Sequence, residues 1–187
     1  MDLMVQQNPN CPQWALFDYD GTLIELKHSS FTEGETFDWE SFILKSADCS
    51  VIEGTVNAMK ALQAHGYVCA ICTARPEIFL DEMIVELTER DLGEDVVIMR
   101  DEKLFNEEVE ALKGLTDPTE IKRTVFEHHA KFRQHVVNDL REQFGMHPIG
   151  FAFDDQPDNL DVFAMEGASC HLVKDGIISE HKTPLRW

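Results

Sequence analysis

The sequence predicts an α/β fold in which a mostly parallel sheet carries helices on both of its faces. Five short apolar stretches, rich in residues that favour strands, alternate with helical patterns along the 187-residue chain. The stretches cover residues 14–17, 67–72, 96–99, 149–153 and 170–173. Strands that alternate with helices form parallel sheets, because each connecting helix packs on one face of the sheet.

Four helical segments are recognised by their apolar spacing and by their ends. They cover residues 51–65, 76–91, 118–144 and 157–166. Glycine follows the first and last segments, at Gly66 and Gly167, and prolines open the last three. One apolar stripe runs through residues 118–144, and it is compatible with one long helix or with two. The polar segment 25–50 and the acidic segment 100–117 are expected to lie outside the core.

The amino-acid composition limits the classes of protein to which the chain can belong. Apolar residues make up 43% of the chain, as in globular proteins, and no apolar run is long enough to span a membrane. No signal peptide is visible, so we expect a cytoplasmic location. The five cysteines have no framework spacing. Cys69 and Cys72 lie on one expected strand and point to opposite faces, which favours free buried thiols.

The formal net charge of the chain is −19. Such a charge repels polyanions at long range, so we expect no extended nucleic-acid-binding surface. Contact with a single phosphate end is compatible with this charge, because local arginines act over short distances.

Polar side chains follow four of the five apolar stretches. They are Asp18 and Asp20, then Thr73 and Arg75, then Arg100, and finally Asp154, Asp155, Asp158 and Asn159. Singly, most are explained as turn residues or helix caps. Together they predict a site, because the active site of an open α/β sheet lies at the carboxyl ends of its strands.

Asp18 and Asp20 are separated by one residue. The repulsion between their negative charges must therefore be offset. Carboxylates that converge from separate strands bind a cation, and oxygen ligands without histidine or cysteine suit Mg²⁺. The sequence therefore predicts a magnesium site at this edge of the sheet.

The same residues resemble the four-motif signature of the haloacid dehalogenase superfamily of phosphohydrolases. The motifs are DYDGT with Asp18 and Asp20, then Thr73, then a helix-borne lysine, Lys122, and then DDQPDN with Asp154 and Asp155. The resemblance covers residues 14–173. It implies a three-layer α/β/α Rossmann-like fold forming one domain over residues 1–187. The core would cover about residues 14–175, with a small cap or flap insertion at about 24–50.

The resemblance also implies catalytic roles. Asp18 would attack phosphorus and form an aspartyl-phosphate, while Asp20 would protonate the leaving oxygen and then activate water. Thr73 and Lys122 would bind the phosphoryl oxygens. Arg75 would hold a second phosphate or the sugar side of the substrate, although a plain salt bridge is an equal alternative.

The implied magnesium ligands are Asp18, the backbone carbonyl of Asp20, and one carboxylate of the pair Asp154 and Asp155. Which of the two binds the ion directly is left open by the sequence.

A closer resemblance is to the 3′-phosphatase domain of bacteriophage polynucleotide kinase/phosphatase enzymes. It rests on the stretches FDWESFILKSADCSVIEG, EIKRTVFEHH and DVFAMEGASCHLV. The chain departs from that domain at Thr73-Ala74-Arg75, where glycine is usual at the middle position. No GxxxxGK[ST] motif of a kinase is present in the sequence, so an end-healing kinase is expected to be a separate protein.

These features favour a Mg²⁺-dependent phosphomonoesterase that acts on nucleic-acid 3′ ends or on nucleotides. The alternative is the same chemistry on a small metabolite such as a sugar phosphate, which the acidic charge favours. A noncatalytic binding protein is a third hypothesis, and a phosphotransferase is a fourth. The expected partner is thus a phosphorylated small molecule or a nucleic-acid 3′ end, with no membrane.

Overall fold

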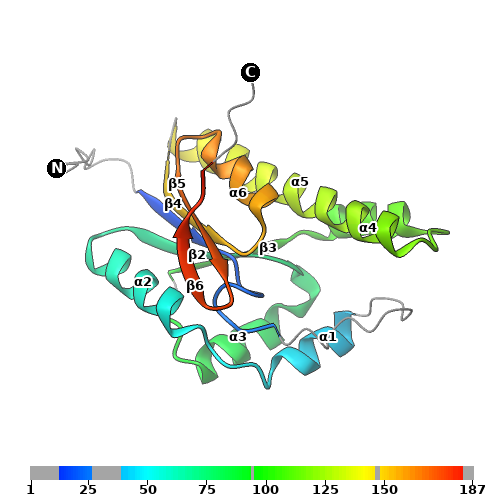
Figure 1. The fold of residues 1–187 in the computed structure, drawn as a ribbon, viewed down its shortest axis with the longest axis horizontal. Coiled ribbons are helices and arrows are strands. Elements are labelled where there is room, and N and C mark those ends of the chain that lie inside the picture. Colours follow the sequence, from blue (N-terminus) through cyan, green and yellow to red (C-terminus); the bar gives the residue numbers. More distant parts are fainter. Residues whose placement is uncertain (1–12, 27–38, 94, 146–147, 183–187) are drawn as a thin grey trace.

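The computed structural model describes residues 13–26, 39–93, 95–145 and 148–182. Its centre is a six-stranded sheet with the order β3-β2-β1-β4-β5-β6 (Figure 1). The strands are β1 (Trp14–Phe17), β2 (Val68–Pro76), β3 (Val96–Arg100), β4 (Ile149–Asp154), β5 (Ser169–Lys174) and β6 (Ile177–Glu180). The first five run parallel to their neighbours, and β6 is antiparallel to β5. The five predicted strands are confirmed.

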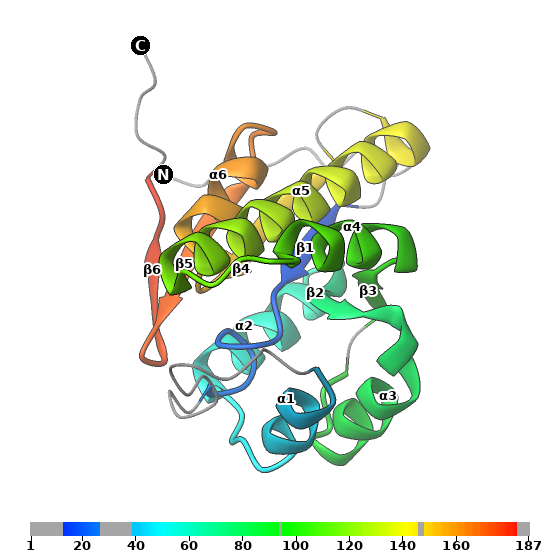
Figure 2. The ribbon, with the colours of Figure 1, turned by 90° about the vertical axis from the view of Figure 1, so that its right-hand side faces the viewer.

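Helices cover both faces of the sheet (Figures 1 and 2). On one face lie α2 (Glu53–Ala64) and α3 (Leu80–Glu89), and on the other lie α4 (Glu102–Leu112), α5 (Pro118–Phe144) and α6 (Pro157–Ala164). A short helix, α1 (Trp39–Ser46), lies beside α3. The predicted three-layer α/β/α architecture is therefore observed. The segment expected as one helix over 76–91 is divided, since Pro76 ends β2 and a 3₁₀ turn, Glu77–Phe79, precedes α3.

Side chains that alternate along each strand divide the core into two clusters. On β1, Ala15 and Phe17 pack toward α2 and α3, whereas Leu16 packs toward α5 and α6. Cys69 and Cys72 follow the same rule and lie in opposite clusters. Burial raises the pKa of the Cys69 thiol to about 12 and that of Cys72 to about 11, so both remain protonated packing residues. The interpretation of this CxxC as core is thus supported.

Residues 118–144 form one helix, α5, of 27 residues. Asp117 caps its first turn by accepting a hydrogen bond from the Thr119 amide at 2.8 Å, and Pro118 follows at the first position. A helix of this length spans about 40 Å, whereas a six-residue strand spans about 20 Å. The fully buried residues of α5 all lie between Phe132 and Leu140. The N-terminal half of α5 therefore projects beyond the carboxyl edge of the sheet.

Two segments differ from expectation. The acidic segment after β3 contains α4, which Asp101 caps by accepting a hydrogen bond from the Leu104 amide at 2.7 Å. The segment after residue 173, for which no element was predicted, contains β6, which returns through a turn at Asp175 and Gly176. Both turn residues have positive φ, 50° and 74°, as Asp-Gly hairpin turns require.

The insertion expected at 24–50 is closed at its base by backbone pairing. The Glu25 amide donates to the Ser50 carbonyl at 2.8 Å, and the Ile52 amide donates to the Leu23 carbonyl at 2.8 Å. Residues 27–38 of this insertion lie outside the described residues. No helix among the described residues combines the length and the apolar character needed to cross a bilayer.

Candidate active site

Three carboxylates meet where the sheet changes direction. The chain leaves β1 toward β2 on one side and returns to β4 on the other, so the carboxyl ends of β1 and β4 flank the switch point. Asp18 follows β1 directly, and Asp154 ends β4. Single carboxylate oxygens of Asp18, Asp154 and Asp155 all lie within 4.8 Å of one another. The structure therefore brings together three of the four predicted metal-site residues.

Backbone and amide groups hold these carboxylates in place. The Asp18 amide donates to the Phe153 carbonyl at 2.9 Å, which joins the ends of β1 and β4. Asp154 Oδ1 accepts hydrogen bonds from the Gln156 amide at 2.9 Å and from Asn159 Nδ2 at 3.0 Å. Asp155 Oδ2 accepts from Gln156 Nε2 at 2.8 Å. Asn159, at the start of α6, is thus a supporting residue for Asp154.

Burial and mutual repulsion disfavour the charged forms of these acids. Burial raises the pKa of Asp18 well above its usual range, the charge of Asp154 raises it further, and Arg133 opposes both effects. Burial and the neighbouring Asp154 raise the pKa of Asp155 to about 7. A divalent cation would relieve this repulsion, and an all-oxygen donor set suits Mg²⁺. The residues therefore fit the predicted ion.

Arg133 on α5 contacts the carboxylate cluster and was not predicted from the sequence. Its Nη2 donates to Asp18 Oδ1 at 2.5 Å and to Asp154 Oδ2 at 3.3 Å, and its side chain is only 2% exposed. It sits between Phe132 and Val136 on the buried stripe of the helix. An arginine on an apolar stripe is the signal that could have identified it, because a buried guanidinium requires an acidic partner.

The Arg75 guanidinium forms ion pairs and hydrogen bonds with other side chains of the protein. It forms a two-pronged ion pair with Asp20, with Nη2 at 2.7 Å from Oδ1 and Nε at 2.8 Å from Oδ2. Its Nη1 donates to Glu86 of α3 at 3.0 Å, and its Nη2 donates to Ser46 of α1 at 2.9 Å. The guanidinium also lies 4.7 Å from the centre of the Tyr19 ring. These contacts fit a residue that orients Asp20 better than one that binds substrate.

Thr73 and Lys122, the two residues expected to bind the phosphoryl oxygens, differ in their burial. Thr73 is buried in β2, and its Oγ1 accepts a hydrogen bond from the Arg75 amide at 3.2 Å. Lys122 is exposed on the projecting half of α5, with Nζ 5.5 Å from the centre of the Phe126 ring. Within the described part of the chain, Arg133 and not Lys122 pairs with the carboxylates.

Arg100, which follows the third apolar stretch of the sequence, is fully buried. Its Nη1 lies 2.5 Å from Glu108 Oε2, and its guanidinium lies 5.5 Å from the Trp39 ring centre and 5.4 Å from that of Phe105. The side chain therefore connects the end of β3 to α4 and to the start of α1.

Gly21 allows the loop after Asp20 to pass close to Asp155. Its φ is +90°, and a Cβ atom there would lie 2.7 Å from Asp155 Oδ2. We expect Gly21→Ala to lower the free energy of unfolding by more than the roughly 1–2 kcal/mol of backbone strain alone. Urea unfolding would measure it beside Gly114→Ala, since Gly114 has φ +79° and a Cβ there would meet no atom within 4 Å. Equal losses in both variants would contradict the close approach to Asp155.

Comparison with known proteins finds similarity in structure only. The sequence matches no protein-family model and no curated protein. A chain from a structure of the Pnkp1/Rnl/Hen1 RNA repair complex aligns over 89% of this chain with a TM-score of 0.54 and 17% identity. A second Pnkp1/Rnl/Hen1 complex gives the same TM-score at 18% identity and 89% coverage. The alignments span 44% and 47% of those longer chains, so the likeness shows a shared fold.

Proposed function

We propose that the protein is a Mg²⁺-dependent phosphomonoesterase of the haloacid dehalogenase type, working through an aspartyl-phosphate. The observation that carries this proposal is the cluster of Asp18, Asp154 and Asp155 at the switch point of the sheet. Asp20 lies two residues beyond the proposed nucleophile, as in the superfamily motif that DYDGT resembles. The order of the four motifs along the chain supports the same conclusion.

Asp18 and Asp20 would divide the chemistry between them. An Asp18 carboxylate oxygen attacks phosphorus, and the bond between phosphorus and the ester oxygen breaks. Asp20 gives its proton to that leaving oxygen. Asp20 then takes a proton from water, which attacks the aspartyl-phosphate and releases inorganic phosphate. The side chain of Asp20 is aimed by its two-pronged contact with Arg75, 2.7 and 2.8 Å long.

The remaining polar groups would neutralise charge. Asp18, Asp154 and Asp155, with the backbone carbonyl of Asp20, would hold Mg²⁺. When bound, the ion would offset the charge of the carboxylates and of the phosphoryl oxygens. Arg133, 2.5 Å from Asp18, is positioned to balance the negative charge that grows on the phosphoryl oxygens. Thr73 would donate its hydroxyl hydrogen to one of those oxygens, and Lys122, on the projecting part of α5, would bind the substrate farther from phosphorus.

The favoured substrate is a 3′-phosphate at a polynucleotide end. Its support is the resemblance to phage 3′-phosphatase domains, together with the fold likeness to a chain of an RNA repair complex. A small phosphorylated metabolite is the second candidate, and the net charge of −19 favours it.

Phosphate release from three substrates would test the function and the substrate together. A 3′-phosphorylated oligonucleotide, nucleoside monophosphates and an aryl phosphate are assayed with Mg²⁺ and again after chelation. We expect Mg²⁺-dependent hydrolysis with the highest kcat/KM for the oligonucleotide. Preference for the small esters would move the search to metabolites. Absence of hydrolysis from every substrate, with correctly folded protein, would refute the phosphatase.

A further inference from the structure

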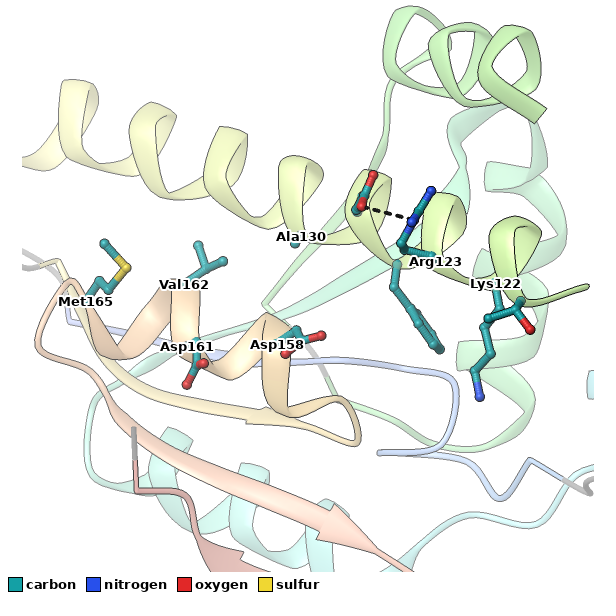
Figure 3. A pocket seen from close by; sticks show the side chains of 10 residues that line it. Lys122, Arg123, Ala130, Asp158, Asp161, Val162 and Met165 are labelled. Atoms are coloured by element: carbon teal, nitrogen blue, oxygen red, sulfur yellow. Dashed lines mark ion pairs between the residues drawn. The ribbon is translucent and has the colours of Figure 1, made fainter. Parts of the chain in front are cut away.

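A cavity of about 670 Å³ lies between α5 and α6 (Figure 3). Its wall on α5 includes Lys122, Phe126 and Ala130. The opposite wall includes Asp158 and Val162 of α6 and Met165, which follows α6 directly. The volume falls within the roughly 300–1,000 Å³ of small-ligand sites. The cavity exists because α5 continues past the carboxyl edge of the sheet, where α6 begins.

The first turn of α6 connects this cavity to the carboxylate cluster. Asp158 and Asn159 are consecutive residues in the first turn of α6, and their side chains lie on opposite sides of that turn. Asn159 is buried and donates to both oxygens of Asp154, at 3.0 and 3.1 Å. Asp158 is exposed and lines the cavity. A phosphate ester whose phosphorus lies beside Asp18 would extend across this turn to place its organic part in the cavity.

The surface of the cavity combines an apolar strip with one available cation. Phe126, Ala130, Val162 and Met165 form the strip, and Met165 is 75% exposed. Lys122 places its ammonium 5.5 Å from the Phe126 ring centre. Arg123, by contrast, pairs with Glu127 at 3.7 Å. Among the described residues Lys122 has no such ion pair, so its charge is free to meet an anion.

We propose that this cavity binds the terminal nucleoside of the phosphorylated strand, an assignment that rests on the proposed phosphatase function. The base packs on Phe126 and the apolar strip, as bases stack on aromatic side chains. Lys122 meets the next phosphodiester on the 5′ side. Asp161, the other acid in the α6 wall, is engaged by His181 at 2.8 Å. Because Lys122 is the one cation of the described wall without an ion pair, the cavity contacts one phosphodiester and not a long stretch of backbone.

The test compares a 3′-phosphorylated oligonucleotide with an aryl phosphate in each variant. We expect Phe126→Leu to lower the ratio of their kcat/KM values by about tenfold, mainly through the oligonucleotide KM, because a leucine cannot stack on a base. Met165→Glu, at an exposed position that tolerates substitution, is expected to lower the ratio in the same direction by charge repulsion. Ile84→Ala is the matched control, since Ile84 is 50% exposed on α3, outside the cavity.

The outcomes separate the two proposals. Hydrolysis of both substrates, with a ratio unchanged in Phe126→Leu and Met165→Glu, would overturn the nucleoside site and leave the phosphatase standing. A fall in the ratio for Ile84→Ala of the same size would also overturn it, because the effect would not be local. Failure of the wild type to hydrolyse either substrate would overturn the proposed function, and the nucleoside site with it.

Discussion

Asp18→Asn is expected to lower phosphate release by at least about 10³-fold, because an amide cannot replace the carboxylate as the attacking group. The change is nearly isosteric, so the neighbouring Asp154 and Arg133 should keep their positions. The assay is initial-rate phosphate release with Mg²⁺ on whichever ester the wild type hydrolyses best. Residual activity within about tenfold of the wild type would contradict the role of Asp18 as nucleophile.

The stability of the same variant separates a chemical role from a structural one. Burial and the charge of Asp154 both disfavour ionised Asp18, and they raise its pKa well above the usual range. Removing that charge should leave the free energy of unfolding in metal-free buffer unchanged or higher. Asp139→Asn is the control, because Asp139 is half-exposed on α5, with His135 3.5 Å away. Loss of both activity and stability in Asp18→Asn would point to a structural carboxylate instead.

Arg133→Met is expected to lower the free energy of unfolding by about 3–5 kcal/mol in metal-free buffer. The guanidinium lies 2.5 Å from Asp18 and 3.3 Å from Asp154, and all three side chains are buried. Methionine fills similar space but leaves two acids without a counter-charge. They must then take up protons or remain charged in a poorly solvated place, and either response costs stability.

Urea unfolding of two further variants would identify the cause. Arg133→Lys keeps the positive charge but loses the guanidinium group that contacts both Asp18 and Asp154. We therefore expect a smaller loss in the free energy of unfolding than for Arg133→Met. Arg123→Met, on the exposed side of the same helix, should change the free energy of unfolding by less than about 0.5 kcal/mol. A loss below about 1 kcal/mol for Arg133→Met would show that Arg133 does not balance the buried carboxylates.

Local patterns in the sequence were sufficient to predict most of the sheet. Runs such as 67–72 and 149–153 are apolar on both faces, which is typical of central parallel strands. β6 was missed because Ile177–Glu180 is short and largely exposed, so its apolar signal is weak. The Asp175-Gly176 dipeptide was an available hairpin signal. The single helix 118–144 was ambiguous, because an apolar stripe does not show whether a helix continues past the core that it covers.

The sequence by itself determined which acids reach the carboxyl edge of the sheet. Asp18 follows one apolar strand and Asp154 ends another, and parallel strands present their carboxyl ends at the same edge. The chemistry of these acids, and the ion that they fit, follows from their residue types. No pairing over a long distance had to be known for this step.

Only the tertiary structure decided which cation meets which acid. Arg133 is 115 positions from Asp18 in the chain, and Arg75 is 55 positions from Asp20. Lysines and arginines on helices look alike in a sequence, and Lys122 was selected by its resemblance to a motif, while Arg133 was not considered. The packing of α5 against the sheet buries Arg133 and leaves Lys122 exposed. Ion pairs between distant segments depend on that packing geometry, which local periodicity does not encode.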